Sequence, residues 1–319
     1  MDKCIVHMDV SPQILLGVSD AARLLGQYEG RSCAISPHVK RENFVRNLHA
    51  NLALEGNTLS VAEVQSLRNG HDVGAMKDEL QQANGFLTVY RKSDHFKVTH
   101  SKDLLTAFLL MNEEQPFYPK MSEDSAIIWN ARMKESLEKV NWLFRCVEQN
   151  EQQHPFIVAA QFHYHMFHLQ PFSRYSDALA RLWHRLLLAR YHHVFFDAPF
   201  ELLIKQNRQR YTDALGTADT AEGLQRFVTF TLECIGESLE IVLDGLDMRS
   251  QRTDDRLAFA KMHFGTEKLT RKKYMELFRN IGPATASRDL KAGLDSGILT
   301  KQGEKARTEY CFVAAAIRK

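Results

Sequence analysis

Apolar residues recur at spacings of three and four along most of residues 1–248, which is the period of one helical face. The clearest such segments are 133–150, 158–169, 178–191 and 224–246. The 16 glycines and 8 prolines of the chain fall mainly between these segments, as helix breakers do. Strand-like alternation is confined to residues 85–98 and to the extreme C-terminus. The pattern therefore predicts a mainly α fold, a helical bundle with at most a small hairpin.

The segment RSQRTDDR, residues 249–256, is polar, charged and aperiodic, which predicts a linker between a domain of residues 1–248 and one of 249–319. The formal net charge of +2 divides unevenly there. Residues 249–319 hold 16 Lys and Arg and 8 Asp and Glu, a net charge of +8, which leaves −6 for the rest. A basic part on an acidic chain suggests an anionic partner, with nucleic acid first among the candidates.

The C-terminal domain shows a compact succession of helix signals. A helix is expected near residues 256–264, a second opens with Thr270 as N-cap, and a third begins at Pro283 and stops before Gly297. Two short strands follow, separated by a loop rich in Lys and Arg. Three helices followed by a hairpin predict a winged helix-turn-helix domain.

Hydroxyl and cationic side chains gather on the third helix and the wing. The helix would present Thr285, Ser287, Arg288 and Lys291, and the wing would carry Lys301, Lys305 and Arg307. Cations release counterions from DNA, and hydroxyls hydrogen-bond phosphates and base edges, so DNA is the predicted partner. The alternative is an interaction or dimerisation module, with another protein or a second copy of the chain as partner.

Composition narrows the class of protein. The chain has 319 residues, 44% of them hydrophobic, and no apolar stretch approaches the roughly 18 residues that span a bilayer. Its first residues do not resemble a secretion signal. The five cysteines are odd in number, lie far apart and form no CxxC pair. These features predict a soluble cytoplasmic protein, with no membrane segment and no structural zinc.

The segment AAQFHYHMFHLQPFSRYSDALARL, residues 159–182, resembles the core of the Fic family of nucleotidyltransferases. The family pattern there is HPFxxGNGRxxR, with Asp or Glu at the fifth position. NLALEGNTLS (51–60) resembles the inhibitory-helix motif, LLIKQNRQRYTDAL (202–215) the Asn-Arg-x-x-Tyr stretch, and 283–299 the winged helix often fused to Fic domains. The resemblance implies a Fic-type helical domain over residues 1–248, with its inhibitory motif near 51–57, and a C-terminal winged helix.

The catalytic positions depart from the family pattern. Pro171, Phe172 and Arg181 agree, whereas Gln170 replaces the catalytic His, Arg174 the metal-binding carboxylate, Tyr175-Ser176-Asp177 the Gly-Asn-Gly, and Ala178 the first Arg. A glutamine has no lone pair basic enough to accept the proton of the attacking hydroxyl. A guanidinium repels the Mg²⁺ that a carboxylate would hold. No catalytic residue and no metal site are therefore expected at these positions.

Other motif residues remain. The resemblance implies an inhibitory pair, Glu55 with Arg181, which is interpreted either as a structural ion pair or as a nucleotide-gated switch. It also implies residual nucleotide binding by Arg181, Asn207 and Tyr211, with ATP as the ligand. The alternative is that Asn207 and Tyr211 belong to an ordinary amphipathic helix.

Three expectations concern the surroundings of the loop. Ser176 and Asp177 have the short acceptor side chains that suit the capping of the next helix. His168 lies about 200° around its helix from Gln170, so it should face elsewhere. The flap hairpin of active relatives should lie between residues 111 and 135, where no clear pair of alternating strands is present.

The residues and the resemblance together favour a catalytically degenerate Fic-fold regulator that contacts DNA. The alternative enzyme is a protein adenylyltransferase, which transfers AMP from ATP to a protein hydroxyl, working by an altered mechanism that relies on substrate positioning. A third hypothesis is an interaction module with neither activity.

Overall fold

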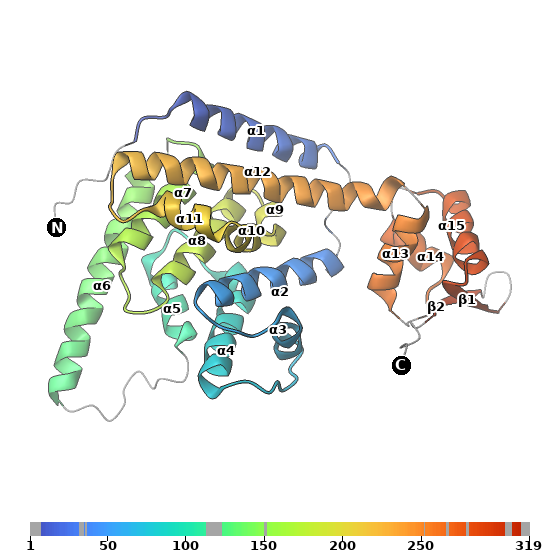
Figure 1. Cartoon of the computed structure of the whole chain (residues 1–319), viewed down its shortest axis with the longest axis horizontal. Coiled ribbons are helices and arrows are strands. Elements are labelled where there is room, and N and C mark those ends of the chain that lie inside the picture. The colour runs from blue at the N-terminus through green and yellow to red at the C-terminus, as the bar shows by residue number, and fades with distance from the viewer. Residues whose placement is uncertain are drawn as a thin grey trace. The chain divides into compact units, whose positions relative to one another are not determined.

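The computed structural model describes residues 8–31, 35, 37–112, 123–149, 152–251, 253–265, 268–278, 281–303 and 308–313. These residues divide into two compact units, one of residues 1–25 and 42–239 and one of 26–41 and 240–319. Most of both units is helical (Figure 1), so the mainly α fold class is confirmed. The domain boundary after residue 248 stays a prediction.

The helices in chain order are α1 Pro12–Glu29, α2 Pro37–Leu54, α3 Val61–Arg68, α4 Lys77–Arg91, η1 Ser93–His95, α5 Ser101–Met111, α6 Glu123–Gln149, α7 Pro155–Leu169, α8 Ser176–Tyr191, α9 Val194–Asp197, α10 Phe200–Gln206, α11 Arg208–Leu215, α12 Ala221–Gln251, α13 Thr253–Phe264, α14 Arg271–Leu277 and α15 Pro283–Asp295. The strands are β1 Leu299–Gln302 and β2 Glu309–Phe312. The four helices predicted from apolar periodicity are confirmed as α6, α7, α8 and α12.

Two local predictions are wrong. The segment 85–98 is helical through α4 and η1, because Ala83, Phe86, Leu87 and Tyr90 are buried at helical spacing on one face of α4. The described residues of the expected linker at 249–256 are also helical, with α12 ending at Gln251 and α13 beginning at Thr253. Its polar side chains misled the prediction because some of them bind a buried carboxylate, as described below.

The larger unit is organised around α7 and α8, which carry its most buried side chains. Trp183 of α8 is fully buried, and its indole N–H donates to the Val98 carbonyl at 3.1 Å. The turn between the two helices is fixed by Phe172, whose ring stacks on Phe108 of α5 with centroids 4.1 Å apart. Within this unit α1 runs alongside α12 (Figure 1), and a Cβ at Gly17 would lie 3.1 Å from Leu232.

The smaller unit contains the three predicted helices and the hairpin. Thr270 caps α14 by accepting from the Lys273 N–H at 3.2 Å, and α15 begins at Pro283, as predicted. Gly297 follows α15 with φ 71°, a conformation that favours glycine. Strands β1 and β2 are antiparallel, with Leu299 opposite Phe312.

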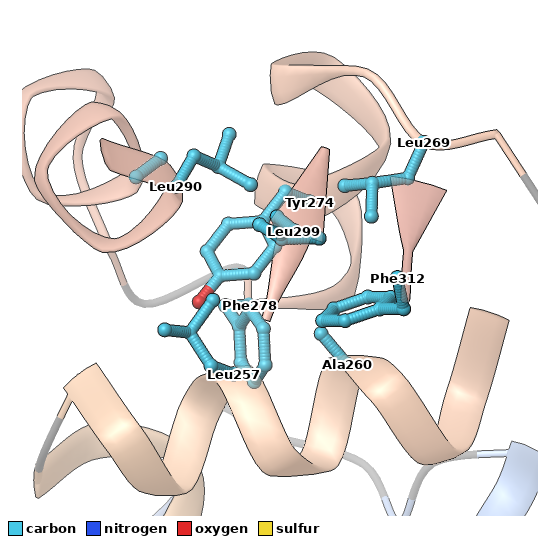
Figure 2. Close-up of a cluster of buried hydrophobic side chains, with 9 residues drawn as sticks. Leu257, Ala260, Leu269, Tyr274, Phe278, Leu290, Leu299 and Phe312 are labelled. Carbon is cyan, nitrogen blue, oxygen red and sulfur yellow. The ribbon is translucent and has the colours of Figure 1, made fainter. Parts of the chain in front are cut away.

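One hydrophobic cluster joins these elements. Figure 2 shows side chains from α13, α14, α15 and the hairpin converging in the core of the smaller unit, which consists of Leu257, Ala260, Leu269, Tyr274, Phe278, Ala286, Leu290, Leu299 and Phe312. Gly293 lets α15 approach the hairpin, because a Cβ there would lie 2.7 Å from Leu299 Cδ1. The assignment of this arrangement as a winged helix stays a prediction.

A buried carboxylate also holds the three helices together. Asp289 of α15 accepts two hydrogen bonds from the Arg256 guanidinium, at 2.6 and 2.8 Å. Thr253 donates to it at 2.8 Å and the Tyr274 hydroxyl at 3.2 Å. Burial alone raises the pKa of Asp289, but the hydrogen bonds from Arg256 and Thr253 outweigh it and lower that pKa.

No helix in the described part of the chain combines the length and the apolar character needed to cross a membrane.

Candidate functional site at the turn between α7 and α8

The turn from Gln170 to Tyr175 is bounded by two residues in the left-handed region. Gln170 has φ 40° and Tyr175 has φ 62°, and they are the non-glycine residues with positive φ among those described. This conformation costs a non-glycine residue about 1 kcal/mol or more. Packing offsets the cost at Tyr175, which is 8% exposed and meets Phe86 edge to face at 5.1 Å.

The Gln170 amide is committed to local hydrogen bonds. Its Nε2 donates to the Asp177 carboxylate at 2.6 Å and to the Phe167 carbonyl at 2.7 Å. Both amide hydrogens are thereby used, and an amide group has no basic nitrogen. His168 does not substitute for it, since its Nε2 lies 3.1 Å from the Leu215 carbonyl.

Arg174 lies where the resemblance implies a metal-binding carboxylate. Its guanidinium donates to the Tyr175 hydroxyl at 2.9 Å. Burial raises the pKa of Tyr175, while Arg174 acts to lower it and Glu55 to raise it. Among the described residues, no group of three His, Cys, Asp or Glu side chains could hold a metal ion.

The predicted capping of α8 by Ser176 and Asp177 is wrong. The N-cap is Tyr175, and no side chain caps the helix there. The Ser176 hydroxyl instead accepts from the Phe172 N–H and donates to the Phe172 carbonyl, both at 3.0 Å. Asp177 is held by Gln170, so both short side chains stabilise the turn rather than the helix end.

Glu55 and Arg181 form an ion pair in the structure. The Arg181 side chain is 3% exposed and that of Glu55 17%. Arg181 Nε also donates to Asn51 Oδ1 at 2.7 Å. Burial alone lowers the pKa of Arg181, but Tyr211, Glu55 and Asp177 raise it above its ordinary value. The guanidinium is therefore charged and bound on two sides, and its inhibitory role stays a prediction.

Asn51 connects this ion pair to a second one. Its Nδ2 donates to the Tyr90 hydroxyl at 3.0 Å and to the Ala178 carbonyl at 3.1 Å. The Tyr90 hydroxyl donates to Glu201 at 3.1 Å. Arg185 Nε donates to the same Glu201 oxygen at 2.7 Å, and both of these side chains are almost fully buried. A continuous polar network therefore runs from Glu55 to Arg185 through the core.

The sequence carries a further signal for this network, which extends beyond the motif at residues 51–60. Asn43, Asn47 and Asn51 are spaced by four residues on α2, with Glu55 four residues further on. Asn43 donates to the Asp197 carbonyl at 2.7 Å and Asn47 to the Ala198 carbonyl at 2.8 Å. A stripe of buried asparagines on one helical face thus binds backbone carbonyls and sets the position of Glu55.

Of the two residues predicted to bind nucleotide with Arg181, Tyr211 lies beside the Arg181 guanidinium. Asn207 makes its hydrogen bond elsewhere. Burial raises the pKa of Tyr211 to about 12, against the opposing effect of the Arg181 guanidinium. Its hydroxyl lies 2.9 Å from His163 Nε2, and His163 Nδ1 lies 3.1 Å from His184 Nδ1. Asn207 donates to the Leu203 carbonyl of its own turn.

The two histidines behave as neutral core residues. Burial lowers the pKa of His184 to about 3, and burial, with lesser effects of His184 and Arg181, lowers that of His163. Two neutral imidazoles can share one hydrogen between their Nδ1 atoms.

The predicted DNA-binding residues lie in the smaller unit. Ser287, Arg288 and Lys291 are exposed on α15, and Thr285 is half-buried. Lys301 is exposed on β1, while Lys305 and Arg307 lie outside the described residues. The structure adds Arg271 of α14, which donates to the Ser287 hydroxyl at 3.3 Å and brings a further cation beside α15.

The predicted flap region is only partly described. Residues 113–122 lie outside the described ranges, and residues 123–135 belong to α6.

Fic proteins are among the known proteins that the chain resembles in sequence and in fold. No protein-family model matches the chain. It is 25% identical over 222 residues to the protein adenylyltransferase Fic of Aedes aegypti, and 24% identical over 223 residues to that of Culex quinquefasciatus. Each match covers 64% of this chain and only 42% of the relative, so the chain spans less than half the length of these proteins.

The solved structures extend the comparison to almost the whole chain. A Fic family protein from Desulfovibrio desulfuricans G20 has a TM-score of 0.64 and 20% identity, over 97% of this chain and 98% of that one. Fic-1 from C. elegans has a TM-score of 0.54 and 18% identity, over 73% and 71%. The fold is that of a helical protein similar to these solved Fic structures. The chain resembles the Fic family in both sequence and fold.

Proposed function

We propose that this chain is a Fic-family protein that has lost adenylyl transfer and acts as a cytoplasmic DNA-binding regulator. The observation that carries the proposal is the Gln170 side chain. It stands at the position of the general base and spends its amide hydrogens on Asp177 and Phe167. Without a base at this position, the attacking hydroxyl keeps its proton.

The charges around the turn support the same conclusion. The Arg174 guanidinium occupies the position of the metal-binding carboxylate and contacts Tyr175. A divalent cation bridging phosphates needs hard anionic oxygens, which Arg174 does not supply. Nucleotide binding is at most residual, because the Arg181 guanidinium is already bound by Glu55 and Asn51.

DNA binding is proposed for the exposed face of α15 together with Arg271. Arg288 and Lys291 supply positive charge, and Ser287 supplies a hydroxyl for phosphate oxygens. Asp289, the acidic residue between them, is fully buried against Arg256, so its charge is neutralised inside the unit. The exposed face therefore carries a stronger positive charge than the sequence of α15 suggests.

The DNA-binding proposal is tested by measuring the affinity of the full chain for mixed duplex DNA at several salt concentrations. The logarithm of the association constant should fall linearly with the logarithm of salt concentration. Arg288→Ala and Lys291→Ala should each reduce the slope by about 0.9. Lys102→Ala, an exposed lysine of the larger unit, is the matched control and should leave it unchanged. A flat salt dependence of the wild-type protein would rule out phosphate contacts.

The second candidate function is protein adenylyl transfer by an altered mechanism. It is favoured by the relatives in Aedes and Culex, which are protein adenylyltransferases, and by the ion pair of Glu55 with Arg181. Incubation with labelled ATP and Mg²⁺ decides between the two functions. We expect no AMP on the protein or on added lysate proteins, in the wild type or in Glu55→Gly. Labelling in either protein would establish the enzyme instead.

A further inference from the structure

A cavity of about 200 Å³ lies in the larger unit, beside the end of α7 that leads into the Gln170 turn. It is lined by side chains of α6, of α7 and of the segment between α11 and α12, namely Lys139, Trp142, His165, His168, Leu169, Thr217 and Asp219. Ligand pockets for drug-sized molecules usually measure about 300–1,000 Å³. The cavity is therefore of a size for a smaller molecule.

His165 is the feature that points to a ligand. Its side chain is 2% exposed, and neither ring nitrogen hydrogen-bonds to a protein atom in the described part of the chain. The nearest ion-pair partner, Asp219 Oδ1, lies 3.7 Å from His165 Nδ1, which is too far for a hydrogen bond. Buried polar groups are almost always satisfied, so a hydrogen-bonding partner for this imidazole is expected.

The charges of the lining define the chemical class of that ligand. Lys139 brings an ammonium group and Asp219 a carboxylate, with side-chain exposures of 19% and 29%. Lys139 is also paired with Glu135 at 2.8 Å, which holds its stem on α6. One cation and one anion on the same lining match a molecule that itself carries both charges. A nucleotide fits poorly, because its phosphates would meet Asp219.

The imidazole of His165 matches the same molecule. A neutral imidazole has one N–H donor and one nitrogen acceptor. It can therefore donate to a carboxylate through one nitrogen and accept from an ammonium group through the other. The ring of Trp142, which meets His165 edge to face at 5.8 Å, and the side chain of Leu169 provide apolar walls.

We propose that this cavity binds a small zwitterion of the free α-amino acid class. Its carboxylate contacts Lys139 and its ammonium group contacts Asp219, with His165 hydrogen-bonded between them. This site is independent of DNA binding by the smaller unit.

Thermal unfolding of the full chain with each of the twenty amino acids tests the site. At least one amino acid should raise the melting temperature, with a shift that grows with the logarithm of its concentration. Asp219→Asn and Lys139→Met should weaken its binding about tenfold or more, because each removes a charged hydrogen-bonding partner. Asp213→Asn and Lys102→Met change exposed residues outside the cavity lining and should bind like the wild type.

Tryptophan fluorescence provides a second readout located at the cavity. Trp142 lines the cavity, and the other tryptophans of the chain are Trp129 and Trp183. The same amino acid should change the fluorescence of the wild type but not that of Trp142→Phe, whose melting temperature should still rise with ligand. The proposal is overturned if no amino acid shifts the wild type, or if the Asp219 and Lys139 variants respond equally. A response to adenine or adenosine alone would also overturn it, in favour of a nucleobase site.

Discussion

The Gln170 side chain donates a 2.6 Å hydrogen bond to the carboxylate of Asp177, so the position at which the resemblance implies a catalytic base is tied to the first turn of α8. Both positions depart from the family pattern, which has His and Gly there. The pairing shows that the substitutions complement each other as a local structural contact. This hydrogen bond also determines the expected effect of replacing Gln170 alone by the histidine of the family pattern.

Gln170→His should not restore adenylyl transfer. The imidazole would stand beside the Asp177 carboxylate, which favours the protonated form and raises the histidine pKa, so the base would be blocked at neutral pH. Arg174 would still repel a metal ion. Transfer of labelled AMP from ATP is measured for Gln170→His. The triple variant Gln170→His/Arg174→Asp/Asp177→Gly is measured beside it for comparison. Labelling by the single variant would show that the other positions do not matter.

Asn51→Ala should lower the free energy of unfolding by about 2–4 kcal/mol. The change removes the acceptor for Arg181 Nε and the donor for the Tyr90 hydroxyl, which leaves buried polar groups unsatisfied. Urea denaturation measures it. Asn69, which accepts from Gln65 at 3.0 Å on the exposed side of α3, is the matched control. Asn69→Ala should change the free energy by less than about 0.5 kcal/mol, and equal losses at both sites would contradict the network.

The helical period in the sequence was sufficient to predict α6, α7, α8 and α12, and cap and turn residues predicted the helices and hairpin of the smaller unit. The prediction failed at residues 85–98, where the apolar residues fit both the alternation of a strand and the spacing of a helix. Only the burial of Phe86 and Tyr90 on one face decides between the two. The predicted linker failed because Thr253 and Arg256 look solvated in sequence but bind Asp289.

Contacts of the candidate site could be predicted only where a family motif implies both interacting residues. Glu55 and Arg181 are 126 residues apart and were linked through the resemblance. Tyr90 and Glu201 belong to no motif, and nothing local in the sequence brings them together with Asn51. The capping prediction for Ser176 failed because the left-handed turn at Tyr175 directs the hydroxyl back to Phe172.

The protein should lose stability as the pH falls below about 6.5, the ordinary pKa of histidine. Burial lowers the pKa of His163 and of His184, that of His184 to about 3, so below pH 6.5 the unfolded chain binds protons that the folded chain does not. By linkage the free energy of unfolding then falls as the pH falls. His184→Asn keeps a hydrogen-bonding group opposite His163 and should reduce the slope by about one proton. The exposed His71→Asn should leave the slope unchanged.

Asp289→Asn should destabilise the smaller unit by about 3 kcal/mol, because the buried Arg256 loses its charged partner. Amide hydrogen exchange in α15 measures this locally, and Asp295→Asn, exposed on the same helix, is the control. Since the folded pKa of Asp289 is lowered, its contribution is present above the unfolded value of about 3.9 and is lost as the pH falls through the folded value. Protection of α15 in the wild type should therefore decrease in strong acid. In Asp289→Asn the protection of α15 should no longer show this decrease in strong acid.

Two glycine-to-alanine changes should have opposite signs. At Gly293 the added Cβ would lie 2.7 Å from Leu299 Cδ1 and 3.1 Å from Leu257 Cδ2, so α15 must move away from the hairpin and α13. We expect Gly293→Ala to lower the melting temperature, at a cost of about 1–3 kcal/mol. At Gly245 of α12 a Cβ meets nothing within 4 Å, and the helix gains about 0.5–1 kcal/mol because alanine loses less backbone entropy than glycine. Differential scanning calorimetry of both variants checks the pair. A rise for Gly293→Ala would mean that Leu299 repacks freely, against the close packing of this core.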